Sequence, residues 1–238
     1  MGNRDPKRIL LVDDAVVVRK VLSQAIGQDP DLEVVATAVN GRVALTKFGA
    51  AKPDLVLLDV EMPEMDGLET VREMRKIDSR VPIIMFSTLT ERGASVTLEA
   101  LALGATDYVT KPSNLDGAVT LDAVTRELIP KIRALCRLPG AQNLALTLPR
   151  AIPYVAPPSI PRRLVSPAKI VIIGVSTGGP DALAHVLPML PAELPVPLLI
   201  AQHMPPVFTT MLASASPQDR SYGCVNVFLG NRSRPAVQ

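Results

Sequence analysis

Short apolar runs alternate with segments of helical periodicity over the first part of the chain. The apolar runs are "RILLV", "LEVVATA", "PDLVLLDV", "VPIIMFS" and "DYVTK". Between them, apolar residues recur every three or four positions in "VVVRKVLSQAI", "RVALTKF", "LETVREMRKI" and "SVTLEALALGA", with charges on the other face. This alternation is typical of a parallel sheet covered by helices. It predicts a doubly wound α/β domain with five parallel strands over residues 7–137.

A different pattern follows residue 137. Residues 138–168 contain seven of the chain's 23 prolines and no Asp or Glu, a composition that favours a semi-extended linker. A second strand and helix pattern then begins at Lys169, with "KIVIIGV", "PDALAHVLPML", "VPLLIAQ" and a short helical "VFTTMLA". This rhythm stops after Ala213. We therefore expect an incomplete α/β domain over residues 169–238.

The charge balance and the two cysteines narrow the class of protein. The chain carries 25 Lys and Arg residues against 23 Asp and Glu, without a long run of one sign, which disfavours nucleic acid as a partner. Nothing after the linker resembles a helix-turn-helix with a basic recognition helix, so a DNA-binding regulator is disfavoured too. No apolar stretch reaches the length of a membrane span. With Cys136 and Cys224 as the only cysteines, we expect a cytoplasmic protein without membrane insertion.

Polar side chains follow the carboxyl ends of four predicted strands. They are Asp13 and Asp14 after the first strand, Asp59 at the end of the third, Ser87 at the fourth and Lys111 at the fifth. The ligand crevice of a doubly wound sheet lies at this edge, so these groups should converge. Each has a structural explanation by itself, since an Asp pair commonly caps a helix and a surface lysine is commonly solvated. Together they favour phosphoryl transfer to Asp59, with Mg²⁺ relieving carboxylate repulsion and with Ser87 and Lys111 stabilising the added oxygens.

The stretches "LLVDDA", "LVLLDVEMPEMDGLE", "IIMFSTLT" and "GATDYVTKP" resemble the receiver domain of two-component response regulators. The resemblance covers about residues 7–137 and implies a flavodoxin-like fold in which Asp59 accepts a phosphoryl group from a histidine kinase. It also implies that the backbone carbonyl of Glu61 completes the metal site, and that Ser87 and Tyr108 form a switch. By the same resemblance we expect a cis peptide bond before Pro112. Tyr108 alone also fits a half-buried aromatic residue of a strand.

The stretch "KIVIIGVSTGGPDALAHVL" places a serine between a strand and a helix. Gly174, Gly178 and Gly179 allow a tight turn there, and Pro180 suits a first helical position. Ser176 and the amides that follow it should therefore lie at a helix N-terminus, which favours an anion or an oxyanion. The loop lacks the lysine of a nucleotide-binding P-loop and the distant acidic residue of a dinucleotide fold, so nucleotide binding fits poorly.

A nucleophilic serine needs a base, and "VPLLIAQ" places His203 at the carboxyl end of the next strand. Without Ser176 opposite, His203 would be interpreted as an ordinary loop residue. With both present, acyl transfer is the leading hypothesis. His185 lies inside the helical segment and is expected to be a surface or packing residue. The serine pattern also fits the nucleophile elbow of α/β-hydrolases. That family needs an acid between Ser and His, where the chain offers only Asp181 and Glu193, both in ordinary helix or loop contexts.

Two motifs, "VIIGVSTGGPDAL" and "LLIAQHMPPVFT", lie behind a receiver-like domain and a linker and resemble the chemotaxis protein-glutamate methylesterases. The resemblance implies that Ser176 attacks the γ-methyl ester of glutamates in the cytoplasmic domains of methylated chemoreceptors. It also implies that His203 is the general base and that the Thr177 amide contributes to the oxyanion hole. Members of this family also deamidate receptor glutamines.

The acid of the triad is not identifiable in the sequence. After His203 the only acidic residue is Asp219, which does not match the Gly-rich acidic segment of the family. We therefore expect a catalytic domain truncated by a deletion or a shifted reading frame after about residue 213. One hypothesis is a methylesterase controlled by phosphorylation, in which the receiver covers Ser176 until Asp59 is modified. The alternative is a phospho-accepting receiver attached to an inactive esterase remnant.

Overall fold

The computed structural model describes residues 5–111, 118–138, 168–191, 194–202, 204–205 and 207–208. Within these residues the strands form one five-stranded sheet in the order β2-β1-β3-β4-β5 and one two-stranded sheet of β6 and β7, and all neighbouring strands are parallel. Their bounds are Lys7–Val12 (β1), Leu32–Ala38 (β2), Leu55–Asp59 (β3), Ile83–Ser87 (β4), Asp107–Thr110 (β5), Val171–Val175 (β6) and Leu198–Gln202 (β7). The first sheet confirms the predicted doubly wound α/β domain.

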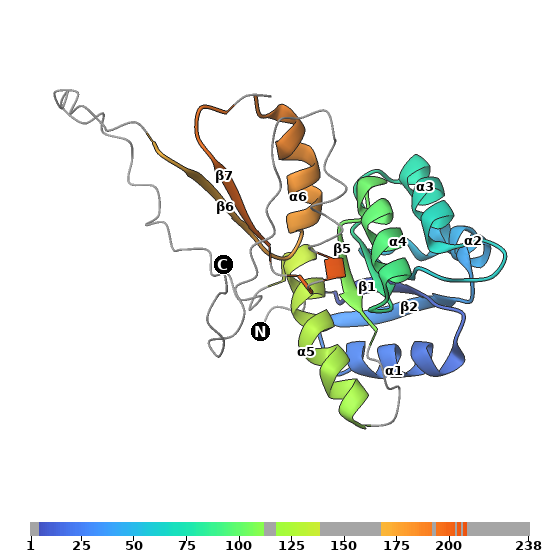
Figure 1. Ribbon diagram of the computed structural model, residues 1–238. Coiled ribbons are helices and arrows are strands. Elements are labelled where there is room, and N and C mark those ends of the chain that lie inside the picture. Colours follow the sequence, from blue (N-terminus) through green and yellow to red (C-terminus); the bar gives the residue numbers. More distant parts are fainter. Residues whose placement is uncertain are drawn as a thin grey trace, which may run out of the picture.

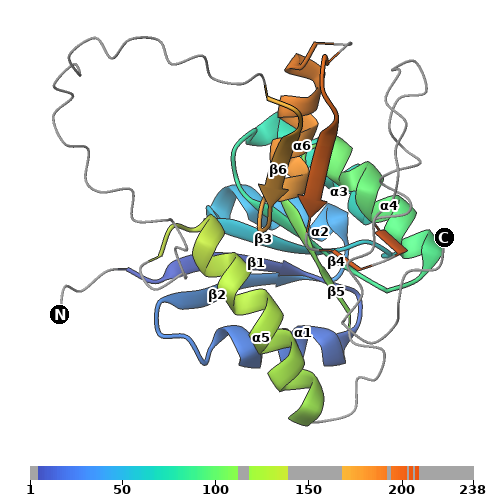
Figure 2. The same cartoon turned by 60° about the vertical axis from the view of Figure 1, so that its left-hand side comes forward.

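Helices cover both faces of the larger sheet (Figure 1). Their bounds are Val16–Ile26 (α1), Gly41–Ala51 (α2), Gly67–Ile77 (α3), Glu91–Ala102 (α4) and Ala118–Leu135 (α5). Helices α1 and α5 contact each other on one face, while α3 contacts both α2 and α4 on the other. Figure 2 shows α1 and α5 together on one side of the strands. This arrangement follows from the crossover rule for parallel strands.

The core of the larger domain consists of two apolar layers, one on each face of the sheet. Leu10 and Leu58 face the layer beneath α2, α3 and α4, whereas Leu11 and Leu57 face the layer beneath α1 and α5. All residues of β3 and β4 are buried. A strand that is covered on both faces needs apolar side chains at every position, which explains the continuous apolar runs in the sequence.

A smaller unit follows the larger domain. It contains β6, helix α6 (Gly179–Val186), the 3-10 turn Leu187–Met189 and β7. Helix α6 lies between the β6–β7 pair and the larger domain (Figure 1) and contacts α4 and β5 of that domain. Apolar side chains of its strands are partly open to solvent, and 62% of the Ile172 surface is exposed. Two strands and one helix fit the expected incomplete α/β domain.

None of the helices in the part of the chain that the structure describes combines the length and the apolar character needed to cross a bilayer. The peptide bond before Pro112 lies outside the described residues.

Candidate active site

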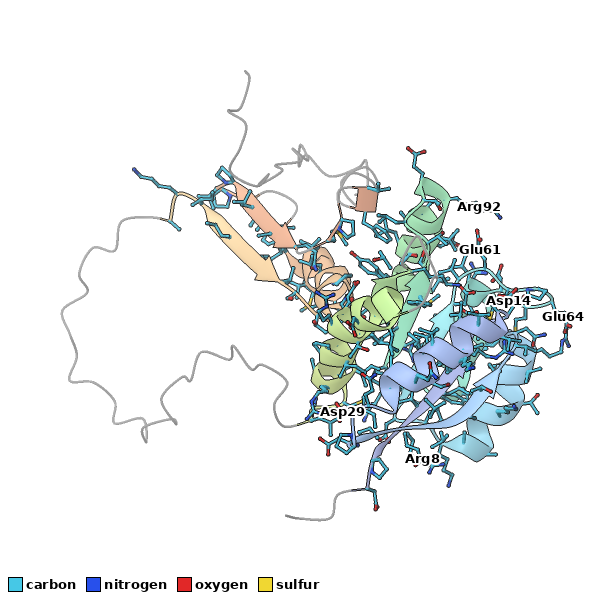
Figure 3. The ribbon with its side chains drawn as sticks, turned by 90° about the horizontal axis from the view of Figure 1, so that it is seen from below. Arg8, Asp14, Asp29, Glu61, Glu64 and Arg92 are labelled. Carbon is cyan, nitrogen blue, oxygen red and sulfur yellow. The ribbon has the colours of Figure 1, made fainter. Side chains whose placement is uncertain are left out.

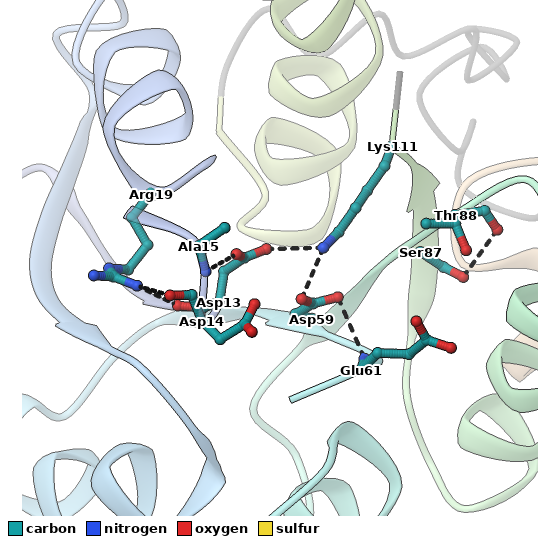
Figure 4. A network of polar contacts seen from close by, with 9 residues as sticks. All are labelled: Asp13, Asp14, Ala15, Arg19, Asp59, Glu61, Ser87, Thr88 and Lys111. Atoms are coloured by element: carbon teal, nitrogen blue, oxygen red, sulfur yellow. Dashed lines mark hydrogen bonds and ion pairs between the residues drawn. The ribbon is translucent and has the colours of Figure 1, made fainter. Parts of the chain in front are cut away.

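An acidic pocket lies at the carboxyl ends of β1 and β3 (Figure 4). Asp13 and Asp14 directly follow β1, and Asp59 is the last residue of β3. Oxygen atoms of the three carboxylates lie within 4.8 Å of one another. Asp13 and Asp59 are buried, whereas Asp14 is exposed. The strand ends thus bring together the carboxylates that the sequence analysis singled out.

Lys111 connects the two buried carboxylates of this pocket. Its Nζ lies 2.7 Å from Oδ2 of Asp59 and 3.0 Å from Oδ2 of Asp13. Burial lowers the pKa of the Lys111 ammonium, but the two carboxylates outweigh this effect and the net shift is upward. The lysine therefore stays charged and is the counter-ion of the pocket. Its position confirms the predicted convergence of strand ends.

The environment of Asp59 works against its ionised form. Burial, followed by the negative charge of Asp13, raises the pKa of the Asp59 carboxyl to about 7, although Lys111 acts in the opposite direction. The backbone N–H of Glu61 lies 3.4 Å from Oδ1 of Asp59. A carboxylate at this pKa is poised between its two protonation states near neutral pH, so a further cation in the pocket would favour the ionised, nucleophilic form.

Arg19 and Asp13 hold the loop that carries the acidic pair. The guanidinium of Arg19 donates to the backbone carbonyl oxygens of Asp13 and Asp14 at 2.6 and 2.9 Å. Oδ1 of Asp13 accepts from the N–H of Ala15 at 2.9 Å. Ala15 is the N-cap of α1 and has no side-chain cap of its own. Sequence reasoning missed Arg19, whose signal is a basic residue one turn into a helix that follows the acidic pair.

The pocket is open to solvent and has a volume of about 300 Å³. Asp14, Asp59, Val60, Glu61, Thr88 and Lys111 line it. At its rim, Arg92 Nε lies 3.6 Å from Oε1 of Glu61. Figure 3 shows Asp14, Glu61 and Arg92 on the side of the domain away from Arg8. Carboxylate oxygens gathered in an open polar pocket fit a hard divalent cation such as Mg²⁺.

Ser87 ends β4, as predicted, but its hydroxyl points to backbone oxygens. Its Oγ lies 3.1 Å from the carbonyl oxygen of Gly93 and 3.3 Å from that of Thr88. Thr88, which the sequence analysis did not single out, lines the pocket instead. The sequence feature that could have indicated Thr88 is its position directly after β4.

Tyr108 is buried rather than half-buried. Its ring stacks on Phe208 with centroids 4.5 Å apart, and the ammonium of Lys131 lies 4.9 Å from the Tyr108 ring centroid. Burial, and then the charges of Asp107 and Glu127, raise the pKa of the Tyr108 hydroxyl. The phenol is therefore neutral and acts here as a packing group.

The serine loop follows β6 as the sequence predicts. Ser176 comes directly after the strand and is exposed, as is Thr177. The N–H of Gly179 donates to the Ser176 carbonyl at 2.7 Å. Gly178 is the N-cap of α6 with φ +71°, the left-handed region that favours glycine. Ser176 therefore lies at the N-terminal end of a helix, but the receiver-like domain does not bury it.

The partner residues of Ser176 are described only in part. The parallel register pairs Val175, which precedes Ser176, with Gln202 at the end of β7. His203 lies outside the described residues. His185 is an exposed residue of α6, which agrees with the expected surface position. Its Nδ1 lies 2.8 Å from the Asp181 carbonyl oxygen.

Two family models match the chain. The response regulator receiver domain matches residues 9–121, and the CheB methylesterase matches residues 171–230. A protein-glutamate methylesterase/protein-glutamine glutaminase of Nocardioides sp. is 46% identical, with 97% of this chain and 63% of the relative covered. A protein of the same description from Trichodesmium erythraeum is 45% identical, with 87% and 58% covered. The chain is thus similar to receiver-linked protein-glutamate methylesterases over both matched ranges.

One solved structure agrees with this similarity over the first domain. The response regulator domain of Thermotoga maritima CheB is 39% identical, with a TM-score of 0.51, and the match covers 56% of this chain and 98% of that one. The chain spans less than two-thirds of the length of the two methylesterase relatives. The two family models together match both the receiver and the serine loop of this chain.

Proposed function

We propose that this chain is a chemotaxis response regulator that is phosphorylated on Asp59 and thereby controls a methylesterase unit. The observation that carries the proposal is the buried Asp59 carboxylate, 2.7 Å from the Lys111 ammonium and beside the carboxylates of Asp13 and Asp14. A buried acid with a fixed counter-ion and an open side is suited to nucleophilic attack on a phosphoryl group.

In the proposed reaction, a carboxylate oxygen of Asp59 attacks the phosphorus of a phosphohistidine on the kinase. The O–P bond forms as the N–P bond breaks, and the imidazole leaves and takes up a proton. Lys111 stabilises the negative charge on the transferred phosphoryl oxygens. A threonine in the pocket lining, Thr88, supplies a hydroxyl at the same face.

We propose that Asp13, Asp14, Asp59 and the backbone carbonyl of Glu61 hold Mg²⁺. The three carboxylates have oxygens within 4.8 Å of one another, a spacing that supports shared ligation. When bound, Mg²⁺ supplies positive charge to the carboxylates and to the incoming phosphoryl oxygens. Arg19 keeps the backbone of the acidic pair in place through its two carbonyl contacts. Ser87 and Tyr108 remain the proposed switch residues.

For the second unit we propose that Ser176 is the nucleophile, His203 the general base and the Thr177 amide an oxyanion donor. In this reaction the serine oxygen attacks the ester carbonyl, methanol leaves, and water then releases the glutamate. The pairing of Val175 with Gln202 supports a common strand end for the two residues, because Ser176 and His203 directly follow this pair. The substrates would be methylated chemoreceptor glutamates, with deamidation of receptor glutamines as a second reaction.

The proposed division of the chain is a receiver over residues 7–137, a Pro-rich linker over 138–168 and a methylesterase unit over 169–238. Family matches over 9–121 and 171–230 support it. The histidine kinase and the cytoplasmic domains of chemoreceptors are the proposed partners, and the proposed location is the cytoplasm.

Intact-mass spectrometry with a small-molecule phosphodonor tests the receiver. We expect a Mg²⁺-dependent gain of one phosphoryl group in the wild type and none in Asp59→Asn. Asp54→Asn is the matched control, because Asp54 pairs with Lys7 beyond the opposite end of β3 and should leave the modification unchanged. A wild type that stays unmodified, or an Asp59→Asn variant that is still modified, refutes the proposal.

A second candidate function is a phospho-accepting receiver with an inactive second unit. One observation favours it. Asp181 is the only acidic residue in the described part of this unit, and its Oδ1 lies 3.5 Å from Nδ1 of His185 on the same helix. Methanol release from methylated receptor membranes separates the two candidates. Release that disappears in Ser176→Ala supports the methylesterase, whereas phosphorylation without release supports the inactive unit.

A further inference from the structure

Two consecutive residues of β5 contact the second unit directly. Oδ2 of Asp107 accepts a hydrogen bond from the N–H of Gly178 at 2.9 Å. The other oxygen of Asp107 lies 3.2 Å from the ammonium of Lys131 on α5. Only 2% of Asp107 is exposed. The buried Asp107 carboxylate therefore contacts both Lys131 of the receiver and Gly178, the N-cap residue of α6.

The contact with Asp107 supplies a hydrogen-bond acceptor that the N-terminus of α6 lacks. Gly178 is the N-cap of this helix and has no side chain that can accept a hydrogen bond. Helix N-termini carry unpaired N–H groups and a partial positive charge, which a nearby carboxylate stabilises. Asp107 supplies this negative charge from the other unit. Helix α6 is thus stabilised at its N-terminus by the receiver.

An aromatic pair forms the second contact. Phe208 is fully buried and stacks on Tyr108 with an interplanar angle of 8°. Phe208 belongs to the same buried cluster as Met85 and Leu101 of the receiver, and Met204 and Val207 pack against this cluster. Buried aromatic pairs contribute more than their apolar area alone. The segment after β7 is therefore anchored in the receiver core.

The negative charge of Asp181 also acts on a cation of the receiver, Arg75. Burial lowers the pKa of the Arg75 guanidinium on α3, while the negative charges of Asp78 and Asp181 raise it. Asp181 belongs to the first turn of α6. The receiver therefore contacts the second unit directly through a carboxylate, Asp107, and an aromatic ring, Tyr108.

The second unit buries little apolar surface within itself. Among its described residues, the large apolar side chains that are buried are Leu183 of α6 and Phe208. Side chains of its sheet stay open to solvent, with 41% of Leu199 and 36% of Ile200 exposed. Helix α6 contacts α4 and β5 of the receiver. An isolated two-stranded sheet is at best marginally stable in water.

We infer that the receiver face formed by Asp107, Tyr108 and Lys131 is the scaffold on which the β6–α6–β7 unit folds. Its partner is the chain's own segment from Gly178 to Phe208. The second unit is ordered because the receiver supplies the negative charge for α6 and the apolar site for Phe208. This inference does not depend on the chemistry of Asp59 or of Ser176.

Hydrogen–deuterium exchange of the full chain, read by mass spectrometry, tests the scaffold. In Phe208→Ala we expect the amides of β6 and β7 to exchange at least roughly tenfold faster than in the wild type, while β1 and β3 keep their protection. Asp107→Asn should accelerate exchange mainly over α6. Met189→Ala is the matched control, because Met189 is 82% exposed, and its exchange should stay within about twofold of the wild type.

Three results would overturn the inference. One is wild-type exchange of β6 and β7 at the rate of an unstructured chain. Another is protection of these strands that stays within about twofold of the wild type in both interface variants. The third is equal acceleration in β1 and β3, because it would mean that the variants damage the receiver core and not a scaffold contact.

Discussion

Lys111 balances two buried carboxylates that repel each other. Its ammonium contacts both Asp13 and Asp59, and without it the repulsion and the burial would favour a protonated Asp59. The same ammonium is placed to stabilise a transferred phosphoryl group. Lys111 thus links the electrostatics of the unmodified pocket to its proposed reaction.

Replacing Lys111 should therefore affect the reaction strongly. In Lys111→Met we expect phosphorylation by a small-molecule donor to be slower by roughly 10²-fold, because one preorganised charge is lost from the pocket. Lys76→Met is the control, since Lys76 pairs with Glu73 on the surface of α3. The measurement is the rate of mass conversion. Equal rates in the two variants would contradict the role of Lys111.

The raised pKa of Asp59 predicts how stability depends on pH without metal. With a folded pKa of about 7 against 3.8 in the reference state, the native protein binds more protons between these values. The free energy of unfolding should therefore fall as pH rises from about 4 to about 7. Asp59→Asn lacks this group and should be more stable than the wild type at pH 8 by up to about 4 kcal/mol.

Urea titrations in the presence of a chelator measure this effect at several pH values. The difference in unfolding free energy between Asp59→Asn and the wild type should grow from acidic pH to pH 8. A difference that does not change with pH would show that burial and Asp13 do not raise the pKa of Asp59.

At the residue scale, strand-end positions predicted the acidic pocket. Asp13, Asp59 and Lys111 meet because parallel strands end at one edge, a rule that needs no side-chain detail. The direction of the Ser87 hydroxyl toward Gly93 was not predictable, because one bond rotation decides it. Arg19 was missed because its contacts go to backbone carbonyls, and a basic residue one turn into a helix does not by itself indicate such contacts.

At the element scale, the start of α3 lies close to the end of β3, against the backbone of the pocket residues Asp59 and Val60. Gly67 begins α3, and a Cβ atom at this position would lie 2.4 Å from the backbone oxygen of Asp59 and 2.9 Å from Cα of Val60. Backbone atoms cannot move aside as a flexible side chain can. The absence of a side chain at Gly67 is therefore a requirement of this junction.

Gly67→Ala should destabilise the protein by roughly 1–3 kcal/mol because it overpacks this junction. Gly49→Ala in α2 is a matched helical control, since a Cβ atom there meets nothing within 4 Å. That change should stabilise the protein by about 0.5–1 kcal/mol through helix propensity. Both effects are measured by urea unfolding. A Gly67→Ala variant as stable as Gly49→Ala would contradict the tight contact.

Periodicity predicted the elements themselves well, because the central strands β3 and β4 are buried on both faces and each helix packs one face on the sheet. It gave no information on tight junctions such as Gly67 beside Asp59, since a glycine near an acidic loop fits many turns. The same limit applies to Asp107, whose contact with Gly178 joins residues far apart in the sequence.

At the scale of the whole molecule, a ligand that binds only the folded receiver should stabilise it. Mg²⁺ at about 100 times its dissociation constant should raise the free energy of unfolding by about 2.7 kcal/mol. Asp13→Asn removes one proposed ligand and should lose most of this gain. Thermal unfolding with and without Mg²⁺ measures it, and an equal gain in Asp13→Asn would place the cation elsewhere.

The arrangement of the two units was the least predictable part of the molecule. The sequence predicted a receiver, a linker and a second strand and helix pattern, and the family matches agree with the first and the last. It gave no sign that Phe208 packs against Tyr108. Packing between units depends on surface shape, which periodicity does not encode.

The most direct test of the proposed function locates the phosphoryl group. An aspartyl phosphate is reduced by borohydride to homoserine, which marks the modified residue in a peptide map. After treatment with a phosphodonor and Mg²⁺, the account predicts homoserine at position 59 and none in Asp59→Asn. Homoserine at Asp13 or Asp14, or at no position in a correctly folded wild type, would contradict it.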